Sequence, residues 1–155
     1  MSVFAWLEQT SLAMWIGLSD SFFAYPLILL LHTIGLTLIV GINLVVALRV
    51  LGVSPQIPLS ELEELFPLMW VGLFMNAFTG VLLFMAKATQ FIVNPAFYFK
   101  MISIVAAVSI FLVMRRHTNN RILALASISF WLLAIIGGRA MAYVGEAAQF
   151  SSLWI

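Results

Sequence analysis

Four long apolar segments, separated by short polar stretches, dominate this sequence. They cover residues 22–50, 66–86, 96–114 and 122–144, and each is close to or longer than the roughly 20 residues that a helix needs to cross a bilayer. The stretches between them hold most of the charged residues, prolines and asparagines, which favour turns outside the membrane. The pattern predicts an all-α fold in which residues 22–155 form a four-helix transmembrane bundle.

The first 21 residues are apolar but interrupted, which makes them different from the four spans. Glu8, Gln9 and Thr10 break the run, and neither an early basic region nor the small-residue cleavage site of a signal peptide is present. Trp6 and Trp15 belong to the residue types that favour the membrane interface. We therefore predict an interfacial amphipathic helix over residues 1–21.

The composition is that of an integral membrane protein. Of the 155 residues, 64% are hydrophobic and 8% are charged, whereas soluble domains are roughly one quarter charged. We therefore expect membrane lipids to be partners of the chain. The sequence has no cysteine, which excludes disulfides and thiolate metal ligands, and its formal charge of +1 does not indicate nucleic-acid binding.

Basic residues predict the orientation of the chain. The connections that follow the first and third spans contain Arg49, Arg115, Arg116 and Arg121. On the opposite side, the connection after the second span contains Lys87. By the positive-inside rule, the first set faces the cytoplasm and both termini face outward.

One stripe on each span is more polar, or built of smaller residues, than a lipid-facing surface. At 100° per residue, the four predicted inward faces are Tyr25, Leu29, His32, Leu36 and Asn43; Met69, Gly72, Asn76, Thr79, Gly80 and Lys87; Lys100, Ser103, Ala107 and Phe111; and Leu132, Ile135, Arg139, Tyr143 and Glu146. The small residues of the second stripe admit either a neighbouring helix or a flat cofactor.

His32 is the leading candidate for a functional residue. It lies about 15 Å from the start of the first span, and an ionisable side chain at that depth is costly. With alternating helix directions, Lys100 and Arg139 fall in the same outer half of the membrane as His32. An imidazole with two cations nearer the surface matches the polarity of a b-type haem and its propionates, with Asn76, Tyr25 and Tyr143 as supporting groups.

Other roles remain open for these residues. His32 can hydrogen-bond Asn76 or a backbone carbonyl and fix helix packing, while Lys100 and Arg139 can extend to the headgroups. The eight methionines and His32 form a soft ligand set that also suits copper. His117, in RRHTNNR, is predicted to be a solvated loop residue.

Several segments of the chain resemble a known family. YPxxxxLHxxGLxLxVGxxxxxxLRxLG, WxGxxxNxxTGxLLF, NPxFxxKM and GRxxAY resemble uncharacterised bacterial four-helix membrane proteins. They are similar, more distantly, to the membrane domain of copper resistance protein D and to b-type cytochrome bundles. The resemblance marks Tyr25, Pro26, His32, Gly35, Arg49, Asn94, Pro95, Lys100, Gly138, Arg139 and Tyr143. It implies a bacterial inner membrane protein.

Two departures limit what the resemblance implies. Ala47 stands where the LRxLG motif leads us to expect an acidic residue, and a transmembrane two-haem relay is excluded because the spans contain a single histidine. The hypothesis is a small protein that binds one b-type haem, with a role in electron transfer to a redox partner or in haem handling. The alternatives are a copper-binding or copper-transport protein and a cofactor-free accessory subunit.

The sequence favours a protein that is not a stand-alone enzyme. His32, Lys100 and Arg139 are the span residues able to act as acids or bases, and no hydrolase, kinase or nucleotide-binding pattern is present. Small residues along the spans, together with almost no mass outside the membrane, favour a homo-oligomer or a subunit of a larger membrane complex.

Overall fold

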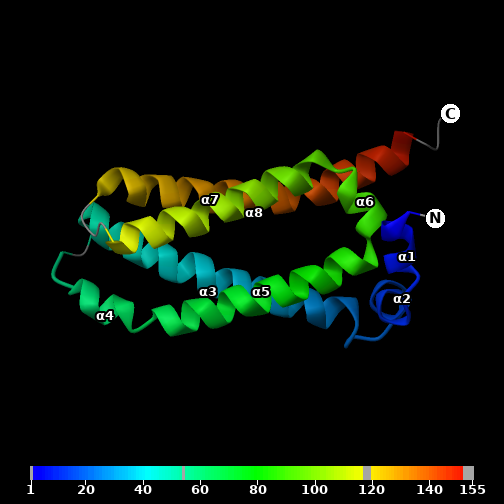
Figure 1. Cartoon of the computed structure of the whole chain (residues 1–155), viewed down its shortest axis with the longest axis horizontal. Coiled ribbons are helices and arrows are strands. Elements are labelled where there is room, and N and C mark those ends of the chain that lie inside the picture. The colour runs from blue at the N-terminus through cyan, green and yellow to red at the C-terminus, as the bar shows by residue number, and fades with distance from the viewer. Residues whose placement is uncertain (1, 54, 117–119, 152–155) are drawn as a thin grey trace. The chain divides into compact units, whose positions relative to one another are not determined.

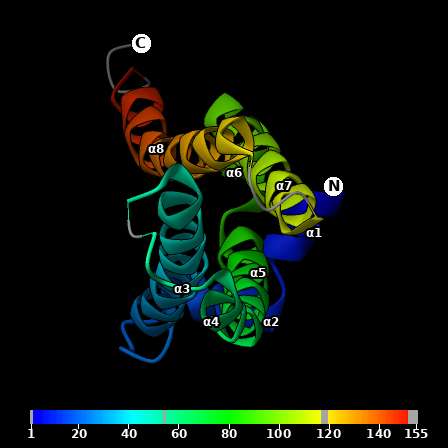
Figure 2. The same ribbon diagram turned by 90° about the vertical axis from the view of Figure 1, so that its left-hand side faces the viewer.

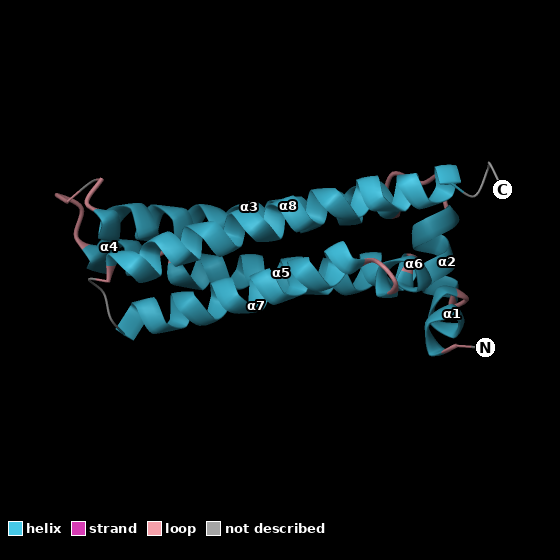
Figure 3. Cartoon of the chain, turned by 90° about the horizontal axis from the view of Figure 1, so that it is seen from above, coloured by secondary structure: helices cyan, strands magenta, loops and turns pink. Residues whose placement is uncertain are grey.

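The computed structural model describes residues 2–53, 55–116 and 120–151, and within these ranges the chain forms helices and loops without strands (Figure 3). The long helices are α3 (Tyr25–Leu51), α5 (Phe66–Ala86), α7 (Pro95–Arg116) and α8 (Arg121–Ser151) (Figure 1). Within the described residues, four helices are long and apolar enough to cross a membrane. The predicted all-α architecture with four spans is confirmed, and the chain is a multi-pass membrane protein.

The observed spans differ from the predicted ones mainly at the ends. The second and third agree within two residues, whereas α8 continues to Ser151, seven residues beyond the predicted end at 144. The prediction ended this span where its apolar run ended. A helix ends at a breaker instead, and GEAAQFS after Val144 contains no proline.

The N-terminal segment is two short helices, which corrects our prediction of one. α1 (Val3–Glu8) and α2 (Ser11–Leu18) are separated at Gln9 and Thr10. The hydroxyl of Thr10 accepts a hydrogen bond from the backbone N–H of Ala13. Thr10 is therefore the N-cap of a new helix, because its side chain satisfies an N–H group that lacks a partner in the first turn.

The described contacts divide the chain into two units. Unit 1 comprises Met1–Ile39 and Phe66–Val93, and unit 2 comprises Val40–Leu65 and Asn94–Ile155. Unit 1 thus holds α1, α2, the first part of α3, α5 and the short helix α6 (Ala88–Ile92). Unit 2 holds the rest of α3, the short helix α4 (Leu59–Glu63), α7 and α8.

In unit 1, the N-terminal helices pack where α5 ends and α6 begins (Figures 1 and 3). Ile16 of α2 is fully buried against Ile28 and Leu83. The carboxylate of Glu8, at the end of α1, accepts hydrogen bonds from the backbone N–H and the hydroxyl of Thr89, each at 2.8 Å. These contacts fasten α1 and α2 to one end of the spanning helices.

In unit 2, α7 and α8 run side by side (Figures 1 and 2). A Cβ atom on Gly137 would lie 3.1 Å from Cδ1 of Phe99 and 3.3 Å from Cα of Lys100, so the glycine permits this approach. At the other end of the unit, Gly52 has a φ of 92° and ends α3 as glycine commonly does. Nε of Arg49 donates to the carbonyl of Ile57, which closes the following loop.

Candidate functional site

His32 lies in the interface between α3 and α5 of unit 1, where Thr79 binds its ring. Nδ1 of His32 is 3.1 Å from Oγ1 of Thr79, and that hydroxyl donates to the carbonyl of Met75 at 2.7 Å. A hydroxyl has one proton, so Thr79 accepts from His32 rather than donating to it. This chain of bonds assigns the ring proton of a neutral His32 to Nδ1 and the lone pair to Nε2.

Asn76 holds the backbone of the same residue. Its Nδ2 donates to the carbonyl oxygen of His32 at 2.8 Å. Asn76 and Thr79 are both buried and stand three residues apart, on one face of α5. α5 therefore supplies two polar side chains to one residue of α3, and the sequence-predicted pair His32 and Asn76 is brought together.

The glycines on these faces serve the contact between the helices. A Cβ atom on Gly35 would lie 2.9 Å from both the backbone nitrogen of Asn76 and the carbonyl oxygen of Gly72. A Cβ atom on Gly80 would lie 3.2 Å from Cε1 of His32. The sequence left two possible partners for the small residues of α5, a neighbouring helix or a flat cofactor. In the structure these residues accommodate the neighbouring helix α3, including the ring of His32. A flat cofactor does not fit between Gly35 and Gly72.

The stripes predicted to face inward are confirmed for most of α5 and most of α7. Met69, Gly72, Asn76 and Thr79 are buried, as are Ser103, Ala107 and Phe111. Lys87, at the end of the α5 stripe, is exposed, and its Nζ lies 5.7 Å from the ring centroid of Tyr25. Tyr25 thus belongs to unit 1 and packs near its N-terminal helices.

The inward stripe predicted for α8 is wrong. Arg139 is exposed and Leu132 and Tyr143 are 54% and 62% exposed, whereas the buried face carries Ala124, Ser127, Trp131 and Ala134. The prediction followed the polar residues of this span. Small residues around one large aromatic ring pack better against a neighbouring helix, and they determine which face is buried.

Lys100, Arg139 and Tyr143 belong to unit 2. Lys100 is half-buried and its side chain runs along α8, because a Cβ atom on Gly138 would lie 3.8 Å from each of its Cδ, Cε and Nζ atoms. The side chain of Glu146, predicted to share a face with Arg139, and the whole of His117 lie outside the described residues.

The residues near His32 offer one strong metal ligand. Among the described residues, no group of three or more His, Asp or Glu side chains is placed to hold a metal ion. Sequence reasoning placed Thr79 on the correct face of its helix but missed that it binds His32. The spacing of Asn76 and Thr79 on a face opposite a histidine was the available signal.

Comparison of the chain with protein-family models, curated proteins and solved structures gives no match.

Proposed function

We propose that the protein binds one b-type haem through Nε2 of His32 and acts in electron transfer or haem handling. The observation that supports this best is the hydrogen bond between Nδ1 of His32 and Thr79. Histidines that bind metals usually donate their other ring N–H to a protein group, which fixes the tautomer and the ring orientation. The residues present can therefore supply one axial ligand to the haem iron, Nε2 of His32.

The chain's own groups have separate tasks in this proposal. When bound, haem b supplies one-electron chemistry. His32 provides the ligand nitrogen, Thr79 orients its ring, and Asn76 holds its backbone. Gly35 is in close contact with Gly72 and Asn76 of α5. A cofactor bound to His32 would therefore lie on a side of the imidazole ring that α5 does not cover.

The remaining parts of the site rest on the sequence. Lys100 and Arg139 are the cations proposed for the propionates, and Tyr25 and Tyr143 are proposed as supporting groups. The second axial position is open, filled by a methionine, or filled by a group from a second copy, in which case oligomerisation completes the site. We place the protein in the bacterial inner membrane with both termini on the periplasmic side.

A cofactor-free accessory subunit is the second candidate, and a specific observation favours it. Thr79 and Asn76 provide His32 with hydrogen bonds to its ring and its carbonyl, as a purely structural polar cluster between two helices would require.

Copper is the third candidate. It would depend on thioethers, because the described chain offers no cluster of three His, Asp or Glu side chains.

Optical spectroscopy of the purified protein separates these candidates. We expect a Soret band, with α and β bands after dithionite reduction, in the wild type and in His117→Ala. In His32→Ala we expect the bands to be lost and to return with added imidazole, which replaces the missing ligand. A featureless wild-type spectrum from cells supplied with haem would refute the proposal, and metal analysis of the same sample would test copper.

A further inference from the structure

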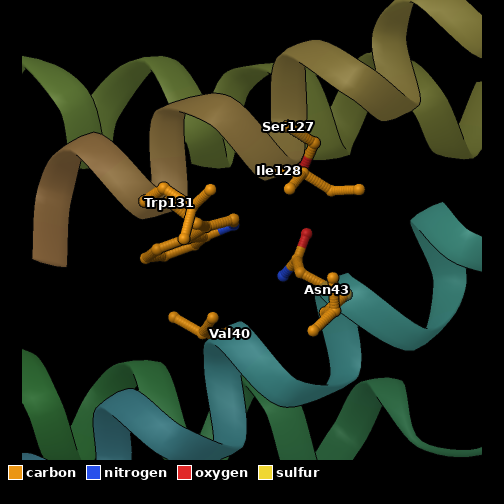
Figure 4. Close-up of a pocket in the computed structure, with 7 residues that line it drawn as sticks. Val40, Asn43, Ser127, Ile128 and Trp131 are labelled. Carbon is orange, nitrogen blue, oxygen red and sulfur yellow. The ribbon is translucent and has the colours of Figure 1, made fainter.

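Unit 2 contains a small cavity between α3 and α8, lined by residues that the proposed function does not use. Its volume is about 40 Å³, and Val40 and Asn43 line it from α3 while Ser127, Ile128 and Trp131 line it from α8. The amide of Asn43 points toward the space between Ser127 and the indole nitrogen of Trp131 (Figure 4). Three polar side chains therefore meet in an otherwise apolar contact.

Two of these groups lack a hydrogen-bond partner among the described residues, namely Oγ of Ser127 and Nε1 of Trp131. Ser127 and Trp131 are only 1% and 3% exposed, and Asn43 is 2% exposed. A buried polar group without a partner is unfavourable, because it has lost its hydrogen bonds to water and gained none in return. An N–H donor and a hydroxyl directed at the same cavity therefore require something there to bind.

The depth of the cavity strengthens this requirement. Asn43 lies eight residues before the end of α3 and Ser127 six residues after the start of α8, or about 12 and 9 Å from those ends. Both positions fall within the hydrocarbon layer of a bilayer, whose total thickness is about 30 Å. Bulk water is absent there, so partners for these groups must be bound inside the protein.

We propose that this cavity is a binding site for internal water, which joins the indole N–H of Trp131 to Ser127 and Asn43. A water molecule needs at least about 10–15 Å³ and two to four polar partners, and the cavity meets both conditions. Pockets for larger organic ligands measure about 300 Å³ or more, so a quinone ring or a lipid headgroup does not fit. The bound water links α3 to α8.

NMR of ¹⁵N-tryptophan-labelled protein in detergent tests the proposal. The indole signal of Trp131 is identified as the one absent from Trp131→Phe. We expect this N–H to show a cross-peak at the water frequency yet to exchange with D₂O at least tenfold more slowly than the exposed Trp6 and Trp15. A wild-type protein without that cross-peak has a dry cavity, which would overturn the proposal.

Two variants at Ser127 distinguish water from the serine hydroxyl itself. Ser127→Ala removes the hydroxyl and leaves the space, so the cross-peak should remain. Ser127→Val fills the space with methyl groups, so the cross-peak should disappear. Ser129→Ala, at an exposed serine of the same helix that bonds the carbonyl of Leu125, should match the wild type. Loss of the cross-peak in Ser127→Ala would overturn the proposal, because the hydroxyl would then have produced it.

Discussion

At the scale of single residues, Thr79 determines which tautomer a neutral His32 adopts. Its hydroxyl donates its one proton to the carbonyl of Met75, so it accepts a hydrogen bond from the imidazole. In a neutral ring, this arrangement places the proton on Nδ1. The same bond stabilises the α3–α5 contact, whether or not Nε2 binds a metal.

Replacing Thr79 with valine keeps the shape of the side chain and removes the acceptor. We expect Thr79→Val to lower the free energy of unfolding by about 1 kcal/mol, within the range measured for hydrogen bonds between membrane helices. Thr79→Ser should retain most of the stability. The measurement is unfolding in mixed detergent micelles, followed by circular dichroism.

Thr33→Val is the matched control for this substitution. Thr33 is exposed, and its hydroxyl donates only to the carbonyl of Leu29 in its own helix. We expect a change below about 0.5 kcal/mol, as for other surface substitutions. Equal losses at positions 33 and 79 would mean that the bond to His32 contributes nothing to stability.

At the scale of helices, the glycines of α3 are not equivalent. Gly35 meets the backbone of α5 at Gly72 and Asn76, whereas around Gly41 the described chain places no atom within 4 Å of an added Cβ. Hydropathy places both residues in the same apolar run. Only the position of the neighbouring helix decides which of them must be small.

Gly35→Ala should therefore separate α3 from α5. An added Cβ would lie 2.9 Å from two backbone atoms, which cannot move without moving the helix, so we expect a loss of about 1–3 kcal/mol in unfolding free energy. Gly41→Ala should be neutral or stabilising by up to about 1 kcal/mol, because alanine favours a helix. The same micelle assay compares the two variants, and similar effects would contradict this account of the interface.

The sequence predicts the spans and some of their inward faces, but it misses a helix break and one buried face. Length and apolarity located the spans, since they reflect the thickness of the bilayer rather than any neighbour. The inward faces of α5 and α7 were predicted because small residues mark them. The break at Thr10 and the buried face of α8 around Trp131 depend on a cap and on side-chain packing, which a count of polar residues does not detect.

At the scale of the whole molecule, orientation in the membrane is testable because the chain has no cysteine. A cysteine introduced at one position is then the only thiol of this protein with which a maleimide can react. Ser60 of α4 and Gln90 of α6 are both exposed. They lie in the connections that the distribution of arginines assigns to the cytoplasmic and outer sides.

We expect a membrane-impermeant maleimide to label Gln90→Cys in intact cells. Ser60→Cys should be labelled at least several-fold more strongly after permeabilisation, because its connection faces the cytoplasm. Labelling of both variants in denatured samples controls for thiol reactivity. The opposite pattern would invert the topology and would place His32 in the inner half of the membrane.

The contact between Gly35 and Gly72 has a further consequence for how unit 1 holds together in lipid. An added Cβ on either glycine would lie close to the carbonyl oxygen of the other, at 2.9 and 3.1 Å, so a Cα–H group of each glycine lies near that oxygen. Such Cα–H···O=C pairs contribute about 0.5–1 kcal/mol each. Lipid does not compete for them, so this glycine pair can keep α3 against α5 where leucine-to-leucine contact has no advantage over leucine-to-lipid contact.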